Sequence, residues 1–181
     1  MNTAVNLKMH IEMHSPLLID LGHHAFSWST PLEIFPVDAV HTGLETEPAS
    51  SDGAPYFELP GNDLDGLLWE MGINSFGGAR AYWLPPDERY KLTRWPNLTQ
   101  HSHTMRQTQM IAVLGNTYAS TSELAALAGV DESEAQRLIN ALSLMRILAR
   151  SAAAPAAPVV TQTAAAKRQS LFGRLRKRLG R

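Results

Sequence analysis

The clearest pattern of hydrophobic and polar positions lies in residues 101–150, where three helix-start signals follow one another. Each signal is a Ser, Thr or Asp followed three residues later by Glu or Gln, the spacing of a capping box that closes the first turn of a helix. The three pairs are Thr104/Gln107, Ser120/Glu123 and Asp131/Glu134. After each pair, apolar residues recur at helical spacing, and Gly129 stands where the second helix should stop. The pattern predicts a tri-helical unit with a tight turn before its third helix.

Residues 61–100 predict one further helix and a β-hairpin. Apolar residues at positions 64, 67, 68 and 71 form one face of a short helix, with Asn62 as its N-cap and Gly72 as its stop. Two alternating aromatic runs, 79–84 and 89–95, flank a Pro/Asp turn and indicate a hairpin. We expect Trp83, Tyr90 and Leu92 to face the core, although the mixture of basic and aromatic residues also fits a surface that binds nucleic acid.

Residues 1–60 contain short apolar runs that prolines repeatedly interrupt. These prolines are Pro31, Pro36, Pro48, Pro55 and Pro60. Because proline cannot donate the hydrogen bond that a sheet interior requires, we expect a largely irregular arm, with a small β-domain as the alternative. Residues 151–166 are rich in Ala and Pro and predict a disordered linker to the tail, residues 167–181.

Together these patterns predict an α+β protein with four parts. The parts are an irregular arm (1–60), a domain that holds the hairpin and the tri-helical unit (61–150), a disordered linker (151–166) and an amphipathic tail (167–181).

The segment 120–148 resembles the helix-turn-helix core of winged-helix proteins. The matching residues are Glu123-Leu124-Ala125, Gly129-Val130, Leu138, Leu142 and Ile147. The chain departs from the family in two places. Met145-Arg146 stands where the family usually has a glycine, and a linker that begins at Ser151 leaves no obvious place for the β-wing.

The resemblance implies that the exposed face of the third helix contacts DNA or a protein partner. The polar residues of that face are Ser133, Gln136, Arg137 and Asn140. Residues 101–150 hold four basic and four acidic side chains, and three of the acidic ones crowd the end of the helix that would approach the duplex. Because DNA binders rely on clustered Lys and Arg, we favour a protein partner and keep DNA as the alternative.

The formal net charge of −1 conceals a separation of charge along the chain. Residues 1–150 hold 9 basic and 17 acidic side chains, whereas residues 151–181 hold 7 basic side chains and no acidic one. The excess of basic charge therefore lies in the linker and tail, away from the helix that would have to read DNA.

The tail has the pattern of a short basic amphipathic helix. Its apolar stripe consists of Leu171, Phe172, Leu175 and Leu179, and the residues between them include Arg174, Arg176, Lys177 and Arg178. The pattern resembles the C-terminal membrane-targeting helices of certain bacterial cell-division and division-site-selection proteins over about twelve residues. We expect it to bind an anionic membrane surface or an acidic protein surface, such as the chain's own arm, with non-specific attraction to nucleic acid as a third possibility.

The sequence contains no motif that predicts catalysis or cofactor binding. Cysteine is absent, which excludes disulfides and thiolate chemistry, and we find no phosphate-binding glycine loop and no nucleophile elbow. His10 and His14 are spaced as helical metal ligands, but their segment has weak helix signals and no convincing third ligand. We therefore expect no enzyme activity, no cofactor and no metal site.

These patterns predict a non-enzymatic adaptor or regulatory protein of bacterial type, whose helix-turn-helix unit docks a protein partner and whose tail binds an anionic surface. The sequence shows neither a signal peptide nor an apolar run of membrane-spanning length. We therefore expect a cytoplasmic protein that lies partly on the inner face of the membrane. The alternative is a DNA-binding transcription regulator that uses the third helix, and the oligomeric state is left open.

Overall fold

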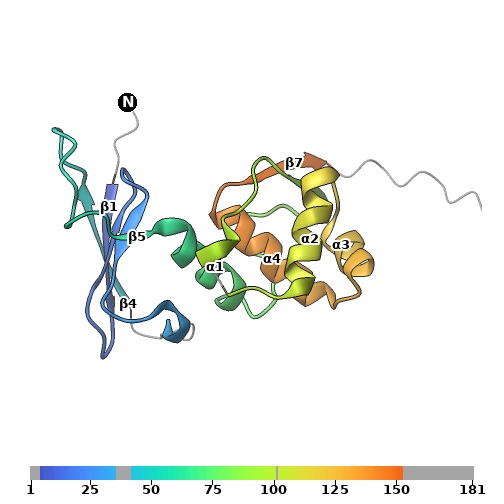
Figure 1. The fold of residues 1–181 in the computed structure, drawn as a ribbon, viewed down its shortest axis with the longest axis horizontal. Coiled ribbons are helices and arrows are strands. Elements are labelled where there is room, and N and C mark those ends of the chain that lie inside the picture. Colours follow the sequence, from blue (N-terminus) through green and yellow to red (C-terminus); the bar gives the residue numbers. More distant parts are fainter. Residues whose placement is uncertain (1–4, 36–41, 101, 153–181) are drawn as a thin grey trace, which may run out of the picture.

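The computed structural model describes residues 5–35, 42–100 and 102–152. Figure 1 shows a sheet built from the N-terminal part of the chain and a helical body built from the C-terminal part, joined by α1 (Leu64–Asn74). The protein is therefore mixed α+β, as the sequence predicts. Among the described helices, none combines the length and the apolarity that crossing a membrane requires.

Five antiparallel strands form the sheet, in the spatial order β4-β1-β2-β3-β5. They are β1 (Val5–Ile11), β2 (Leu17–Asp20), β3 (Ala25–Ser27), β4 (Thr42–Pro48) and β5 (Asn62–Asp63), with a 3-10 turn, η1 (Leu32–Ile34), after β3. Leu7, Met9 and Ile11 alternate along β1 and belong to the apolar cluster beneath α1. Lys8 and His10 lie on the opposite face, where both pair with Glu45 of β4 at 3.5 and 3.1 Å. The sheet thus has one apolar and one charged face.

The prediction of an irregular arm over residues 1–60 is wrong, because pairing between distant segments orders it. β1 pairs with β2 across a short turn and with β4 across a much longer separation. The prolines tolerate this pairing because they stand at its margins: Pro16 precedes β2, Pro48 ends the edge strand β4, and Pro60 lies just before β5. The expected boundary after residue 60 also cuts the sheet, since β5 pairs with β3.

Three helices make up most of the helical body: α2 (Met105–Asn116), α3 (Thr121–Ala128) and α4 (Glu132–Leu144). Complete capping boxes at Thr104 and Ser120 begin α2 and α3, as predicted. Gly129 ends α3 in the left-handed conformation, at φ 64°. The third box does not form, because Asp131 occupies the N-cap of α4 without a side-chain hydrogen bond. A second 3-10 turn, η2 (Leu98–Gln100), precedes α2.

A second, two-stranded sheet replaces the predicted hairpin. Residues 79–84 form no strand, and β6 (Glu88–Leu92) pairs instead with β7 (Leu148–Ala152), which follows α4. Tyr90 and Leu92 are buried, as predicted, but Trp83 is 36% exposed. The local alternation of residues 89–95 therefore predicts the strand correctly. The predicted pairing partner, residues 79–84, is wrong, because the actual partner β7 lies far along the chain.

Strand β7 also changes the expected ends of the domain and linker. Arg146 makes the turn into β7 in the left-handed region, at φ 55°, where the winged-helix family usually has a glycine. Ser151 and Ala152, expected to begin the linker, belong to this strand. The remainder of the predicted linker, residues 153–166, and the whole tail lie outside the described residues.

Helix α1 is buried on two sides rather than on the single face that its spacing predicts. Leu64 and Leu67 pack with Trp28 in the core beneath the sheet. Trp69 belongs to the core of the helical body, and Leu68 packs against both cores. The helix therefore joins the two halves through apolar contacts on both sides.

The ends of α1 also differ from the prediction. Asp63, rather than Asn62, is the N-cap, and its carboxylate accepts a hydrogen bond from the backbone N–H of Asp65. Gly72 does not stop the helix, which continues for two further residues. It lies instead where α1 crosses α4, and a Cβ built there would be 2.2 Å from the Cα of Ala141. The glycine is therefore required by the close approach of two helices.

The connection between the edge strands β4 and β5 passes over Asp20, which lies on the same face of the sheet as Lys8. In this connection the backbone N–H of Tyr56 donates to Asp20 at 3.0 Å, and the backbone and ring N–H groups of His23 each donate to the same carboxylate at 2.9 Å. Asp20 is 2% exposed. Burial raises the pKa of Asp20, but these hydrogen bonds outweigh it and hold the pKa below its ordinary value.

We expect Asp20→Asn to flatten the acid dependence of stability. A carboxyl whose pKa is lower in the folded than in the unfolded state stabilises the fold above its unfolded pKa, about 3.9, and loses that contribution as the pH falls through the folded value. The free energy of unfolding, measured in urea, should therefore fall below about pH 5 more steeply for the wild type than for the variant. Glu58→Gln, an exposed control, should keep the wild-type slope. Parallel curves for the wild type and Asp20→Asn would refute this role of Asp20.

We expect Gly72→Ala to lower the free energy of unfolding by about 1–3 kcal/mol, because the added methyl group overlaps the backbone of α4. The loss should occur even though Ala forms helices better than Gly by up to about 1 kcal/mol. Asn74→Ala, at an exposed position of the same helix, should stay within about 0.5 kcal/mol of the wild type in the same urea titration. Equal stability of Gly72→Ala and the wild type contradicts the close crossing of α1 and α4.

Candidate functional site

The face of α4 that the sequence offers as a contact surface is largely internal. Gln136 is 8% exposed and Asn140 is 0% exposed. Asn140 accepts the backbone N–H of Ala81 at 3.2 Å and donates to the backbone carbonyl of Ala79 at 2.8 Å. Gln136 donates to the same Asn140 oxygen at 2.9 Å. Asn140, to which Gln136 is hydrogen-bonded, thus holds the segment 77–84 against α4.

The prediction that Gln136 and Asn140 lie on an exposed face is therefore wrong. Each satisfies polar groups beneath a segment that lies far away in the sequence, so the spacing along the helix alone does not reveal their burial. Ser133 is exposed, but Gly78 lies against it: a Cβ built at Gly78 would be 2.8 Å from the Ser133 Cβ. Arg137 is half-buried. Two of the four side chains that the DNA-binding alternative needs, Gln136 and Asn140, are thus buried.

The segment over α4 and the residue before it form an aromatic cluster, the aromatic platform, which consists of the partly buried Phe76 and the exposed Tyr82 and Trp83. The Trp83 ring packs edge-on against Phe76 at a centroid distance of 5.4 Å and against Tyr82 at 5.0 Å. Tyr82 is 93% exposed. The indole N–H of Trp83 donates to the hydroxyl of Ser143 on α4 at 3.1 Å. The platform is therefore both open to solvent and fixed in position.

An open groove of about 300 Å³ lies along the same segment, between the start of β6 and the first turns of α3 and α4. Its acidic lining residues, Asp87, Glu88 and Glu132, define what we call the acidic groove. Arg80 also lines it, but its guanidinium donates to the backbone carbonyl of Leu84. Glu88 forms an ion pair with Arg150 at 3.7 Å. The acidic side chains outnumber the basic one in the lining, so the groove favours a basic ligand.

A cluster of hydrogen-bonded polar side chains joins the sheet to the helical body. Asp65, at the buried start of α1, accepts a hydrogen bond from His24 on one oxygen and from Arg94 on the other, each at 2.9 Å. His24 lies between β2 and β3 and Arg94 lies just after β6, so the three residues come from three parts of the chain. Nothing in the local sequence indicates this cluster, since 41 positions separate His24 from Asp65.

The same cluster contains the one described group of side chains with a geometry suited to a metal ion. Ligand atoms of His24, Asp63 and Asp65 lie within 4.8 Å of one another. However, Arg94 occupies the second oxygen of Asp65, and Asp63 caps α1. The carboxylates thus already have partners within the fold, and we assign the cluster the role of a structural tie between the two halves.

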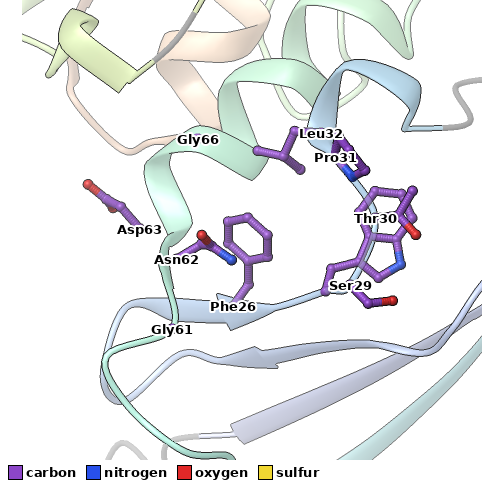
Figure 2. A pocket seen from close by; sticks show the side chains of 10 residues that line it. Phe26, Ser29, Thr30, Pro31, Leu32, Gly61, Asn62, Asp63 and Gly66 are labelled. Carbon is purple, nitrogen blue, oxygen red and sulfur yellow. The ribbon is translucent and has the colours of Figure 1, made fainter.

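Figure 2 shows an open pocket of about 600 Å³ between the sheet and the first turn of α1. Phe26 and Asn62 stand side by side on one wall, and Thr30 and Pro31 stand opposite. Within its lining, Asp63 is the single ionisable residue. The pocket therefore offers shape and a mostly polar lining, but no acid–base pair and no set of metal ligands.

The remaining residues that the sequence singles out have separate partners or lie outside the described residues. His10 pairs with Glu45, while the ring of His14 packs against Trp28 at a centroid distance of 5.8 Å. All of the predicted tail residues fall outside the described ranges: Leu171, Phe172, Arg174, Leu175, Arg176, Lys177, Arg178 and Leu179.

No family model, curated protein or solved structure matches the chain. The winged-helix resemblance therefore stays a prediction, which rests on residues 120–148. Any functional conclusion has to come from the geometry described above.

We expect Asn140→Leu to loosen the platform and to lower the free energy of unfolding by about 1–3 kcal/mol, because it leaves the backbone N–H of the buried Ala81 without a partner and removes the hydrogen bond to Ala79. Hydrogen exchange at the Ala81 amide should accelerate in the variant. Asn116→Ala, at the exposed end of α2, should change stability by no more than about 0.5 kcal/mol. If Asn140→Leu leaves both stability and exchange unchanged, Asn140 does not hold the segment.

Proposed function

We propose that the protein is an adaptor that docks a protein partner through the aromatic platform. The observation that carries this proposal is the 93% exposure of Tyr82 on a segment that α4 holds in place. Tyr and Trp dominate the binding energy of protein interfaces because they bury a large area and have few rotatable bonds. A platform that is already fixed loses little conformational entropy on binding, which favours affinity.

The two other classes of function have weaker support among the described residues. DNA recognition through α4 requires side chains such as Gln136 and Asn140, which the fold uses internally. Catalysis requires convergent reactive groups, whereas the larger pocket has Asp63 as its single ionisable lining residue.

The tail supplies a second attachment in this proposal. Residues 151–181 carry 7 basic side chains and no acidic one, and the apolar stripe of the tail suits an anionic membrane surface or an acidic partner. An adaptor of this kind acts in the cytoplasm and lies in part on the inner face of the membrane.

The proposal is tested with the full chain as bait. A captured protein is identified, purified, and titrated calorimetrically against the wild type and two variants. Tyr82→Ser should weaken binding by about tenfold or more, equivalent to about 1.4 kcal/mol, because it removes an exposed anchor. Met13→Ser, which removes a side chain that is 97% exposed in the turn after β1, should bind like the wild type.

Circular dichroism and urea unfolding should be the same for all three proteins, because both substituted side chains are almost fully exposed. If Tyr82→Ser binds the purified partner as tightly as Met13→Ser does, the aromatic platform is not the docking site.

A further inference from the structure

We propose that the tail of this chain, residues 167–181, binds back onto the aromatic platform and the acidic groove and thereby regulates docking. The inference rests on the proposed function of the platform and names the segment that competes with the partner. Four features support it: the point where the chain leaves the body, the length of the tether, the charges, and the apolar surfaces.

The chain leaves the described body at the rim of the acidic groove. Ala152, the last residue of β7, is the pairing partner of Glu88 in β6, and Glu88 lines the groove. The tail is therefore tethered beside the surface that it is proposed to bind.

The tether has a suitable length. Residues 153–166 comprise 14 residues. A random coil of that length would have a root-mean-square span of about 20 Å, and a fully extended chain would reach at most about 50 Å. A ligand on such a tether is present at a local concentration in the millimolar range, so even a weak contact is populated.

The charges are complementary. The acidic groove presents Asp87, Glu88 and Glu132, and Asp131 is exposed next to Glu132. The sheet also carries exposed carboxylates, such as Glu47, but the groove lies at the point where the chain leaves the described body. The groove rather than the N-terminal arm is thus the acidic surface that we assign to the tail.

The apolar surfaces also correspond. Glu132 of the groove and Ser143, which holds Trp83, lie eleven residues apart on α4, or about 16 Å along the helix axis. The predicted stripe from Leu171 to Leu179 would span about 12 Å as a helix. A helix of this length is able to place leucines on the platform while its arginines reach the groove or stack on the exposed aromatic rings. In that position it covers Tyr82, so a partner has to displace it.

The test uses a nitroxide spin label on the full chain. The protein has no cysteine, so Ser170→Cys provides a single labelling site in the tail. In the ¹⁵N-labelled protein, we expect the label to broaden the indole N–H signal of Trp83 and the amide signals of residues 80–88, and to leave those of β1 sharp. Leu175→Asp, and separately Arg174→Glu with Arg176→Glu, should restore the broadened signals. The matched double variant Arg174→Lys with Arg176→Lys should keep the broadening.

Two outcomes overturn the inference. One is broadening that is absent or spread evenly over the body. The other is equal broadening of the same signals when spin-labelled ¹⁴N chains are mixed with ¹⁵N chains that carry no spin label, since the tail of another copy is then responsible. Because this experiment contains no partner, its failure leaves the docking role of Tyr82 intact. Conversely, if Tyr82→Ser does not weaken partner binding, the tail contact is unaffected.

Discussion

The division of α1 between two cores is the constraint on which the arrangement of this molecule depends. Leu64 and Leu67, near the start of the helix, pack in the core beneath the sheet, and Trp69 packs in the core of the helical body. Asp65 completes the connection because it accepts hydrogen bonds from His24 of one half and from Arg94 of the other. A buried carboxylate without such partners is strongly destabilising, so the two halves are linked electrostatically as well as by apolar packing.

Local signals in the sequence predict the helical body well, because a cap depends only on residues within one turn. Thr104, Ser120 and Gly129 act as their local patterns indicate. The sheet is missed because strand order is a matter of distant pairing, and the prolines receive too much weight. The alternation of Leu7, Met9 and Ile11 is a signal that reveals β1 when it is weighed against those prolines.

The candidate site is less predictable than the fold for a related physical reason. Gln136 and Asn140 have the spacing of a polar helix face, and the covering segment 77–84 lies more than fifty positions earlier in the chain. Burial of these amides and exposure of Tyr82 are two consequences of the same packing. The sequence shows that the segment contains aromatic residues, but which of them faces solvent depends on how α4 holds the backbone of the segment.

The pairing of β6 with β7 has a consequence for the order in which the protein is made. Strand β6 leaves the ribosome before α2, α3 and α4, but its pairing partner follows all three helices. The five strands of the sheet, by contrast, are all synthesised by the time α1 emerges. During translation β6 therefore lacks its β7 partner until residues 148–152 are available, and in the meantime only the bridge between Tyr90 and Ala119 pairs with its other edge. A ribosome that stalls or terminates before this point releases a product with an open sheet edge, which is a species prone to aggregation and a natural client for chaperones.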